Sequence, residues 1–304
     1  MKPFLIGSSN LKHHGKILGC PYVGATNVQR LMNSADYQKP RFLAKLGSIT
    51  KDSKVIVSLT NNSIHYDTHK LKWHCPKPKL VKGDKLSSLN SLFNHNEFFK
   101  LNKNTEVCSI FDPERILTFE SNLIEFFGHL KRRLVQLKVE DLKDRIVILP
   151  TPPRHAYKCC SDASHKVVNR NASEFVVTSI YKRVIEKFNT EADCEFIRLD
   201  SNDKFIAHLL VTCDIDKLLT TRQKQWFYSK AKNKNFQNFY HNKLLHKIIY
   251  KRILTKKDNY THFRRPFIKV LTKYIRLTLS SDFNPIKKVK KKYLEIHRDA
   301  KRGQ

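Results

Sequence analysis

Glycine is scarce in this sequence, with 8 residues among 304, and cysteine is limited to 7. So little glycine excludes a collagen-like chain, and so few cysteines in a chain of this length exclude a small disulfide scaffold. No stretch of about 18 apolar residues occurs, so we expect no membrane-spanning helix. The apolar run at residues 4–7 is too short for the core of a signal peptide. The odd number and irregular spacing of the cysteines favour reduced thiols, which predicts an intracellular protein, cytoplasmic or nuclear.

Acidic residues are also few: 27 Asp and Glu face 58 Lys and Arg, which gives a formal net charge of +31. Residues 221–304 contain 24 Lys and Arg but only 4 acids, a net of +20, whereas residues 1–220 have a net of +11. This imbalance predicts attraction to polyanions and says nothing about the fold. Because 40% of the residues are hydrophobic, the chain can fill a core, and wholesale disorder is excluded.

Two kinds of apolar pattern alternate along the chain. Short apolar runs bounded by turn residues predict buried strands at 4–7, 54–59, 145–149 and 194–199. Apolar residues at helical spacing predict helices at 117–137, 173–188 and 241–254, with a shorter helix after Gly24. Ser173 can cap the start of the second of these helices.

Strands that alternate with helices predict an α/β fold with a mostly parallel sheet, arranged as a three-layer α/β/α sandwich. We assign residues 1–255 to this domain, with an irregular insertion at about 63–110, and residues 256–304 to a basic C-terminal extension. In such sheets ligands bind outside the carboxyl ends of the strands.

Residues suited to nucleophilic catalysis follow those strand ends. Ser9 follows the first strand, and Asn61 follows the second and offers a side-chain N–H donor. Gly24 can bring a backbone N–H close to a ligand because it has no Cβ. His241, at the start of a predicted helix, is a candidate general base.

The order of these motifs resembles the SGNH/GDSL hydrolase superfamily over about residues 4–254. That family has a flavodoxin-like α/β/α sandwich fold and hydrolyses esters, usually of acyl or acetyl groups. The resemblance implies Ser9 of Gly7-Ser8-Ser9 as the nucleophile, and Gly24 and Asn61 as oxyanion donors. It implies Asn238 and His241 as the remaining catalytic pair, matching the family's Asp-x-x-His block.

The chain departs from the family pattern at several positions. Ser8 replaces the Asp of the first block, Leu59 and Asn62 replace a Gly and an Asp of the third, and Asn238 replaces the triad Asp. An Asn orients an imidazole but stabilises imidazolium poorly. Two functions therefore stay open: a serine esterase acting on an unidentified ester, or a catalytically inactive relative that binds nucleic acid. The departures and the Lys- and Asn-rich composition also resemble fast-evolving viral or mobile-element proteins.

Other residue clusters offer weaker alternatives. Asp162 and His165 have the same Asp-x-x-His spacing, in what we interpret as a loop, and His165 is an alternative base. The group His65, His69, His74 and Cys75 lacks a Cys-x-x-Cys partner, so no metal site is predicted. No phosphate-binding glycine motif occurs, and no cofactor is predicted.

Basic and aromatic residues interleave in the C-terminal region, a pattern suited to phosphate contacts and base stacking. It predicts a nucleic-acid or other polyanion patch, whose members are Trp226, Lys230, Lys232, Lys234, Arg264, Arg265 and Lys290.

Overall fold

The computed structural model describes residues 2–7, 9–24, 28–59, 113–149, 163–200, 208, 221–222 and 265–279. For residues 9–10, 113, 115, 163–176 and 265–267 it describes the backbone alone.

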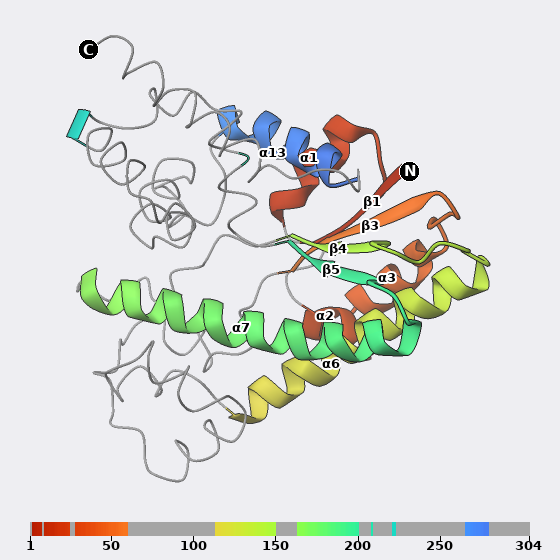
Figure 1. The fold of residues 1–304 in the computed structure, drawn as a ribbon, viewed down its shortest axis with the longest axis horizontal. Coiled ribbons are helices and arrows are strands. Elements are labelled where there is room, and N and C mark those ends of the chain that lie inside the picture. The colour runs from red at the N-terminus through yellow and green to blue at the C-terminus, as the bar shows by residue number, and fades with distance from the viewer. Residues whose placement is uncertain are drawn as a thin grey trace, which may run out of the picture.

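A five-stranded parallel sheet organises the described chain (Figure 1). Its strands are β1 (Lys2–Gly7), β2 (Tyr22–Gly24), β3 (Ser53–Ser58), β4 (Ile146–Ile148) and β5 (Ile197–Leu199). They lie in the order β2-β1-β3-β4-β5, and every neighbouring pair is parallel. This confirms the predicted α/β fold with a parallel sheet. The strand order is that of flavodoxin-like doubly wound sheets.

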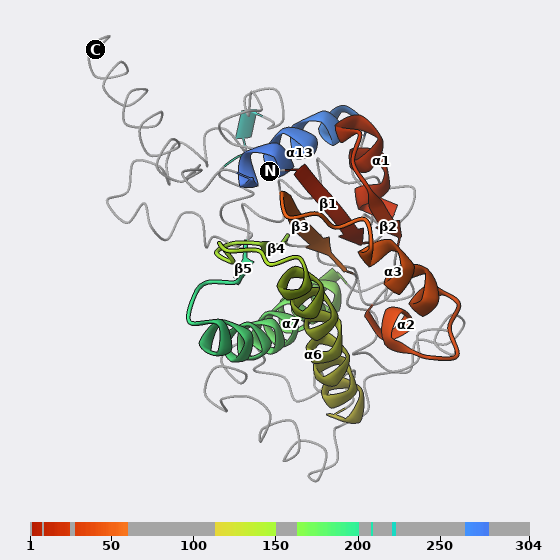
Figure 2. The same ribbon diagram turned by 90° about the vertical axis from the view of Figure 1, so that its right-hand side faces the viewer.

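Helices lie on both sides of the sheet (Figures 1 and 2). On one side are α1 (Ser9–Leu18) and α13 (Arg265–Thr278). On the other are α2 (Val28–Met32), α3 (Gln38–Leu46), α6 (Pro113–Gln136) and α7 (Ala163–Ala192). Among the described residues, no helix is long and apolar enough to cross a membrane.

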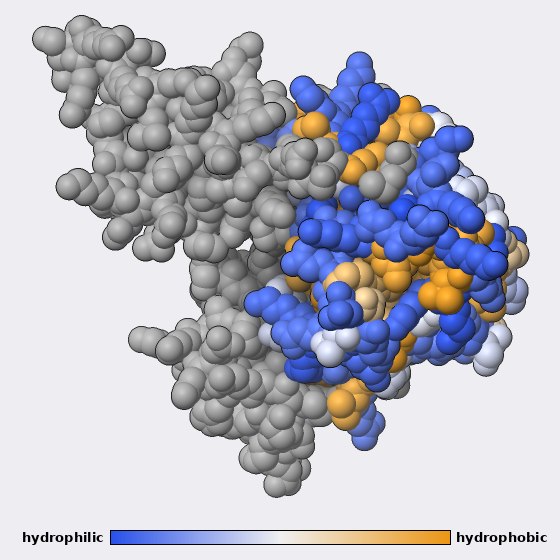
Figure 3. Space-filling model, turned by 45° about the vertical axis from the view of Figure 1, so that its right-hand side comes forward, coloured by the Kyte–Doolittle hydropathy of each residue, from blue (hydrophilic) through white to orange (hydrophobic). Residues whose placement is uncertain are grey.

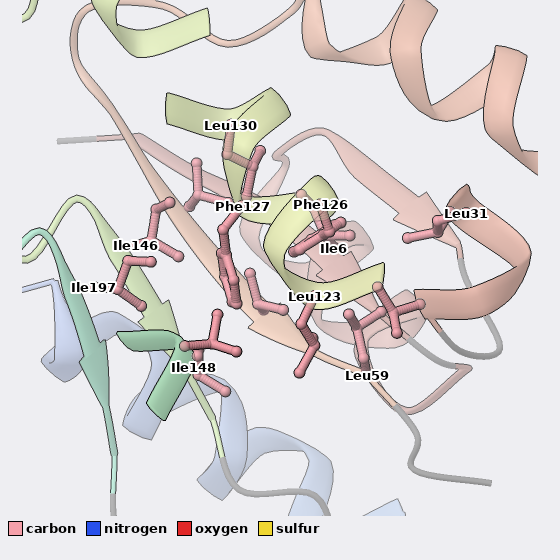
Figure 4. Close-up of a cluster of buried hydrophobic side chains, with 14 of the residues drawn as sticks. Ile6, Leu31, Leu59, Leu123, Phe126, Phe127, Leu130, Ile146, Ile148 and Ile197 are labelled. Atoms are coloured by element: carbon pink, nitrogen blue, oxygen red, sulfur yellow. The ribbon is translucent and has the colours of Figure 1, made fainter. Parts of the chain in front are cut away.

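The larger part of the core lies between the sheet and α6. Strand side chains that point to this face, such as Ile6, Val57 and Ile148, are at most 2% exposed. They meet Phe126 and Phe127, which are fully buried (Figure 4). Both aromatic residues lie on the apolar stripe that predicts this helix, so burial of that stripe explains why the segment is helical and where it docks.

The opposite face of the sheet is partly polar, since the buried Lys54 and Ser58 share it with Ile56 of β3. Because side chains alternate along a strand, Leu5, Ile56 and Val147 point away from the larger core, and each is fully buried. On the same side, Tyr274 and Ile275 of α13 are also fully buried.

The helix boundaries correct one expectation. The predicted helix at 173–188 is part of α7, which starts ten residues earlier at Ala163. Ser173 therefore lies inside a helix and does not cap its start. Helix 241–254 and the insertion 63–110 lie outside the described residues.

Candidate functional site

Three adjacent strands, β2, β1 and β3, end at the same level of the sheet. Gly7 of β1 pairs with Gly24 of β2 on one side and with Ser58 of β3 on the other. The chain leaves β1 toward β2 and later returns to form β3 on the opposite flank. This reversal makes the end of β1 the topological switch point, where doubly wound sheets bind their ligands.

Ser9 stands at this switch point. It is the first residue of α1 and follows the end of β1 by two positions. The first backbone N–H groups of a helix have no partner within the helix, so a helix N-terminus favours nearby negative charge. The structure describes the backbone of Ser9 and leaves its side chain outside the description.

Gly7 fixes the end of β1 through close packing. A Cβ at this position would lie 2.3 Å from the backbone oxygen of Ser58 and 2.9 Å from a methyl of Leu11. The Tyr22 hydroxyl donates a hydrogen bond to the Gly7 oxygen at 3.0 Å. Burial raises the pKa of Tyr22 to about 12, so the hydroxyl stays protonated and remains a donor. The strand that leads into Ser9 is therefore held from both neighbouring strands.

Gly24 is the second predicted site residue that the structure describes. It ends β2 and is exposed, and a Cβ there would lie 3.3 Å from the Tyr22 hydroxyl. Gly24 and Ser9 thus belong to neighbouring strand ends. The third expected element, Asn61, comes two positions after the buried Leu59 and lies outside the described residues, as do Asn238 and His241.

The alternative base belongs to a helix. His165 is the third residue of α7, and Asp162 directly precedes that helix. The interpretation of this segment as a loop is therefore wrong for His165. The apolar stripe that predicted the helix begins at Val176, so it did not indicate the helical turns before that residue. The N-terminal part of α7 extends past the carboxyl ends of the strands (Figure 1). Helices α1 and α7 lie on opposite faces of the sheet, but both Ser9 and His165 belong to the end of the sheet where the strands finish. The side chain of His165 lies outside the description.

The predicted nucleic-acid patch is described at one residue alone. Arg265 begins α13, and its side chain lies outside the description. Trp226, Lys230, Lys232, Lys234, Arg264 and Lys290 lie outside the described residues.

A buried polar cluster that no sequence pattern indicates lies between the sheet and α13. Arg198 of β5 forms ion pairs with Asp144 and, at 3.3 Å, with Asp200. The Tyr274 hydroxyl donates to Asp200 at 2.8 Å, and Arg198 donates to the Thr278 oxygen at 3.1 Å. These bonds tie α13 to the end of β5. The contacts with Asp144 and α13 leave no sign in the sequence because their partners are 54 to 80 residues apart.

Lys54 adds a buried cation to this face. It is 1% exposed on β3, and burial, followed by repulsion from Arg198, lowers its pKa, while Asp144 and Asp200 oppose the shift. Two carboxylates therefore face two cations in a site covered by α13. A charge-balanced cluster of this kind positions a helix, and we assign it no catalytic role.

Two buried histidines also hold α13. His14 of α1 contacts the Thr272 hydroxyl at 2.7 Å, and that hydroxyl donates to the Ile268 oxygen, so His14 supplies the proton of the first bond. The ring of His208 packs on Tyr274 at 5.1 Å between ring centroids. Burial lowers the pKa of each histidine to about 4, aided at His14 by His13. Both are therefore neutral near pH 7.

Within the described part of the chain, no group of three or more His, Cys, Asp or Glu is placed to hold a metal ion. The two described cysteines, Cys20 and Cys194, are free thiols.

No protein-family model, curated protein or solved structure matches this chain.

Proposed function

We propose that this protein is a serine hydrolase that cleaves an ester bond, with Ser9 as the nucleophile. The observation that carries the proposal is the level alignment of Gly24, Gly7 and Ser58 at the switch point, directly before the helix that Ser9 begins. This alignment brings one expected oxyanion donor, Gly24, to the strand beside the nucleophile. The other expected donor, Asn61, follows β3, which is the strand on the opposite flank of β1 from β2.

In the proposed reaction, the Ser9 oxygen attacks the ester carbonyl carbon while His241 accepts the hydroxyl proton. The negative charge that develops on the carbonyl oxygen is stabilised by the Gly24 N–H and the Asn61 side-chain N–H. Collapse of this intermediate breaks the ester bond, and His241 returns the proton to the leaving alcohol. Water, deprotonated by His241, then attacks the acyl carbon; the bond from that carbon to the Ser9 oxygen breaks, and His241 returns the proton to that oxygen. Asn238 orients the imidazole but, being neutral, stabilises the imidazolium poorly. We therefore expect slower turnover than with a complete Ser-His-Asp triad.

The fold supports the choice of Ser9 over other serines. Ser9 begins a helix of 10 residues, whose N-terminal N–H groups favour a developing negative charge nearby. Gly7 admits no side chain, so β1 and β3 approach closely just before this turn. Ser48, in contrast, is exposed between α3 and β3, near the amino-terminal end of the strands.

Hydrolysis of p-nitrophenyl acetate and butyrate by the full chain tests the proposal. Ser9→Ala should reduce kcat/KM by at least about 1000-fold, because loss of a nucleophile leaves only binding and oxyanion stabilisation. The control Ser48→Ala should keep the wild-type rate. Equal rates for the wild type and Ser9→Ala, including no rate in either, would overturn the proposal.

The same assay separates the two candidate bases. His241→Ala should abolish turnover, and His165→Ala should leave it near the wild-type value. If His165→Ala removes activity and His241→Ala does not, then the Asp162 and His165 pair supplies the base and the assignment of His241 is wrong.

A further inference from the structure

The two helices on one side of the sheet carry no acidic residue. Helix α1 has the sequence SNLKHHGKIL and α13 has RPFIKVLTKYIRLT. They lie side by side in both views (Figures 1 and 2). Their Lys and Arg residues are Lys12, Lys16, Arg265, Lys269, Lys273 and Arg276.

Five of these cations have described side chains, and all five are exposed; we call them the basic face. They are Lys12, Lys16, Lys269, Lys273 and Arg276. None forms an ion pair with a described residue.

Several cations on the other side of the sheet are paired with carboxylates. Lys39 contacts Glu125 at 2.9 Å, and Lys131 contacts Glu191 at the same distance. Arg183 contacts Glu120 at 2.6 Å. Helices α6 and α7 thus contain acidic residues among their cations, whereas α1 and α13 contain cations alone.

The spacing on α13 suits a regular array of anions. Lys269, Lys273 and Arg276 are spaced by four and three residues, so they share one face of the helix. Lys269 and Arg276 are about 10 Å apart along the helix axis, a length over which one strand of B-DNA presents about three phosphates. A row of unpaired cations with this spacing matches a phosphate backbone.

The chemistry of the face distinguishes nucleic acid from a membrane surface. A helix that binds a membrane inserts an exposed apolar face into the lipid. Here the apolar residues Leu271 and Ile275 of α13 are buried, and Ile17 is the large apolar side chain exposed on the described parts of these helices. Figure 3 likewise shows hydrophilic residues over much of the visible surface, with hydrophobic residues in separate patches.

Base stacking is also disfavoured. Tyr274, the described aromatic side chain on α13, is fully buried, and α1 has no aromatic residue other than histidine. The face therefore offers charge without a stacking surface, which suits paired bases more than splayed single strands.

We infer that the basic face binds the phosphate backbone of double-stranded nucleic acid without sequence preference. This binding does not depend on Ser9 chemistry, and it uses residues outside the patch that the sequence predicts.

Fluorescence anisotropy with a labelled 20-base-pair DNA duplex of mixed sequence tests this inference. The variant Lys269→Gln/Lys273→Gln/Arg276→Gln removes three cations. If each contacts one phosphate, the slope of log K against log salt falls by about 2.7 in magnitude. The wild type should then lose about 40-fold more affinity than the variant between 50 and 200 mM salt. The variant Lys12→Gln/Lys16→Gln, on α1, should reduce the magnitude of the same slope by about 1.8. This second variant tests the inference even if the α13 variant fails to fold.

The matched control removes three exposed cations from the opposite side of the sheet, with Arg132→Gln/Lys182→Gln/Lys187→Gln. It lowers the net charge equally and should leave the slope unchanged. An equal effect of the control and the α13 variant would overturn the inference, because binding would then follow net charge alone. Undetectable duplex binding would also overturn it. So would binding to phosphatidylserine vesicles that the α13 variant loses while duplex binding is retained.

Discussion

Mild acid should loosen the packing of α13 through its two buried histidines. His14 and His208 are each 1% exposed, and burial lowers the pKa of each to about 4. In the unfolded chain a histidine has a pKa of about 6.5. Between these two values the unfolded state binds more protons than the folded state. Stability must therefore fall as the pH drops through 6.5.

The size of the effect follows from the two pKa values. At pH 5, an unfolded histidine is about 97% protonated, whereas a folded one with a pKa of about 4 is about 9% protonated. Linkage then gives a loss of about 2 kcal/mol per histidine between pH 7 and pH 5, or about 4 kcal/mol for the pair. This is a large fraction of the stability of a typical domain.

Urea unfolding at pH 7 and pH 5, followed by circular dichroism, measures this loss. The comparison variant is His14→Asn/His208→Gln, because each amide keeps a donor near the ring nitrogen it replaces. The variant should be less stable at pH 7 but should lose about 4 kcal/mol less than the wild type on acidification. Equal losses in the two proteins would refute the reasoning, because the carboxylates common to both would then account for the whole effect.

Two further predictions concern packing. Phe127→Ala should lower the free energy of unfolding by about 3 to 5 kcal/mol, because the ring is fully buried, whereas the exposed Val135→Ala should change it by less than about 0.5 kcal/mol. Gly7→Ala should lower the free energy of unfolding by about 1 to 3 kcal/mol, because the added Cβ would clash with the Ser58 oxygen. Gly128→Ala in α6, where the nearest contact is 3.7 Å, should instead stabilise the protein by about 0.5 to 1 kcal/mol. Thermal and urea unfolding measure all four.

Strong local patterns predicted the parts of the fold that bury whole faces. Four of the five strands were predicted because parallel strands buried on both faces leave continuous apolar runs, as in KVIVS of β3. The short β2 was missed, since only Val23 of its three residues is buried. Its place beside β1 depends on long-range pairing.

Helix α13 shows how charge obscures a helical pattern. Leu271, Tyr274 and Ile275 have helical spacing, but they lie within a segment that we assigned to a basic extension because of its Lys and Arg content. Their burial against the sheet depends on His14, Arg198 and other partners far away in the sequence. No local pattern identifies these contacts.

The candidate site is predictable only in part for a similar reason. The sequence shows that Ser9 and Asn61 follow predicted strands. That β1 lies between β2 and β3, so that Gly24 and Gly7 end level with each other, is a property of strand order and register. The choice between His165 and His241 depends on side chains outside the described residues, and it stays a prediction.

Covalent labelling with a fluorophosphonate probe tests whether Ser9 is an activated nucleophile, because the probe reacts with such a serine and needs no knowledge of the natural ester. After proteolysis and mass spectrometry, we expect one modified peptide, with the label on Ser9 and labelling abolished by His241→Ala. An intact chain that stays unlabelled, or one labelled equally well in Ser9→Ala, would contradict it.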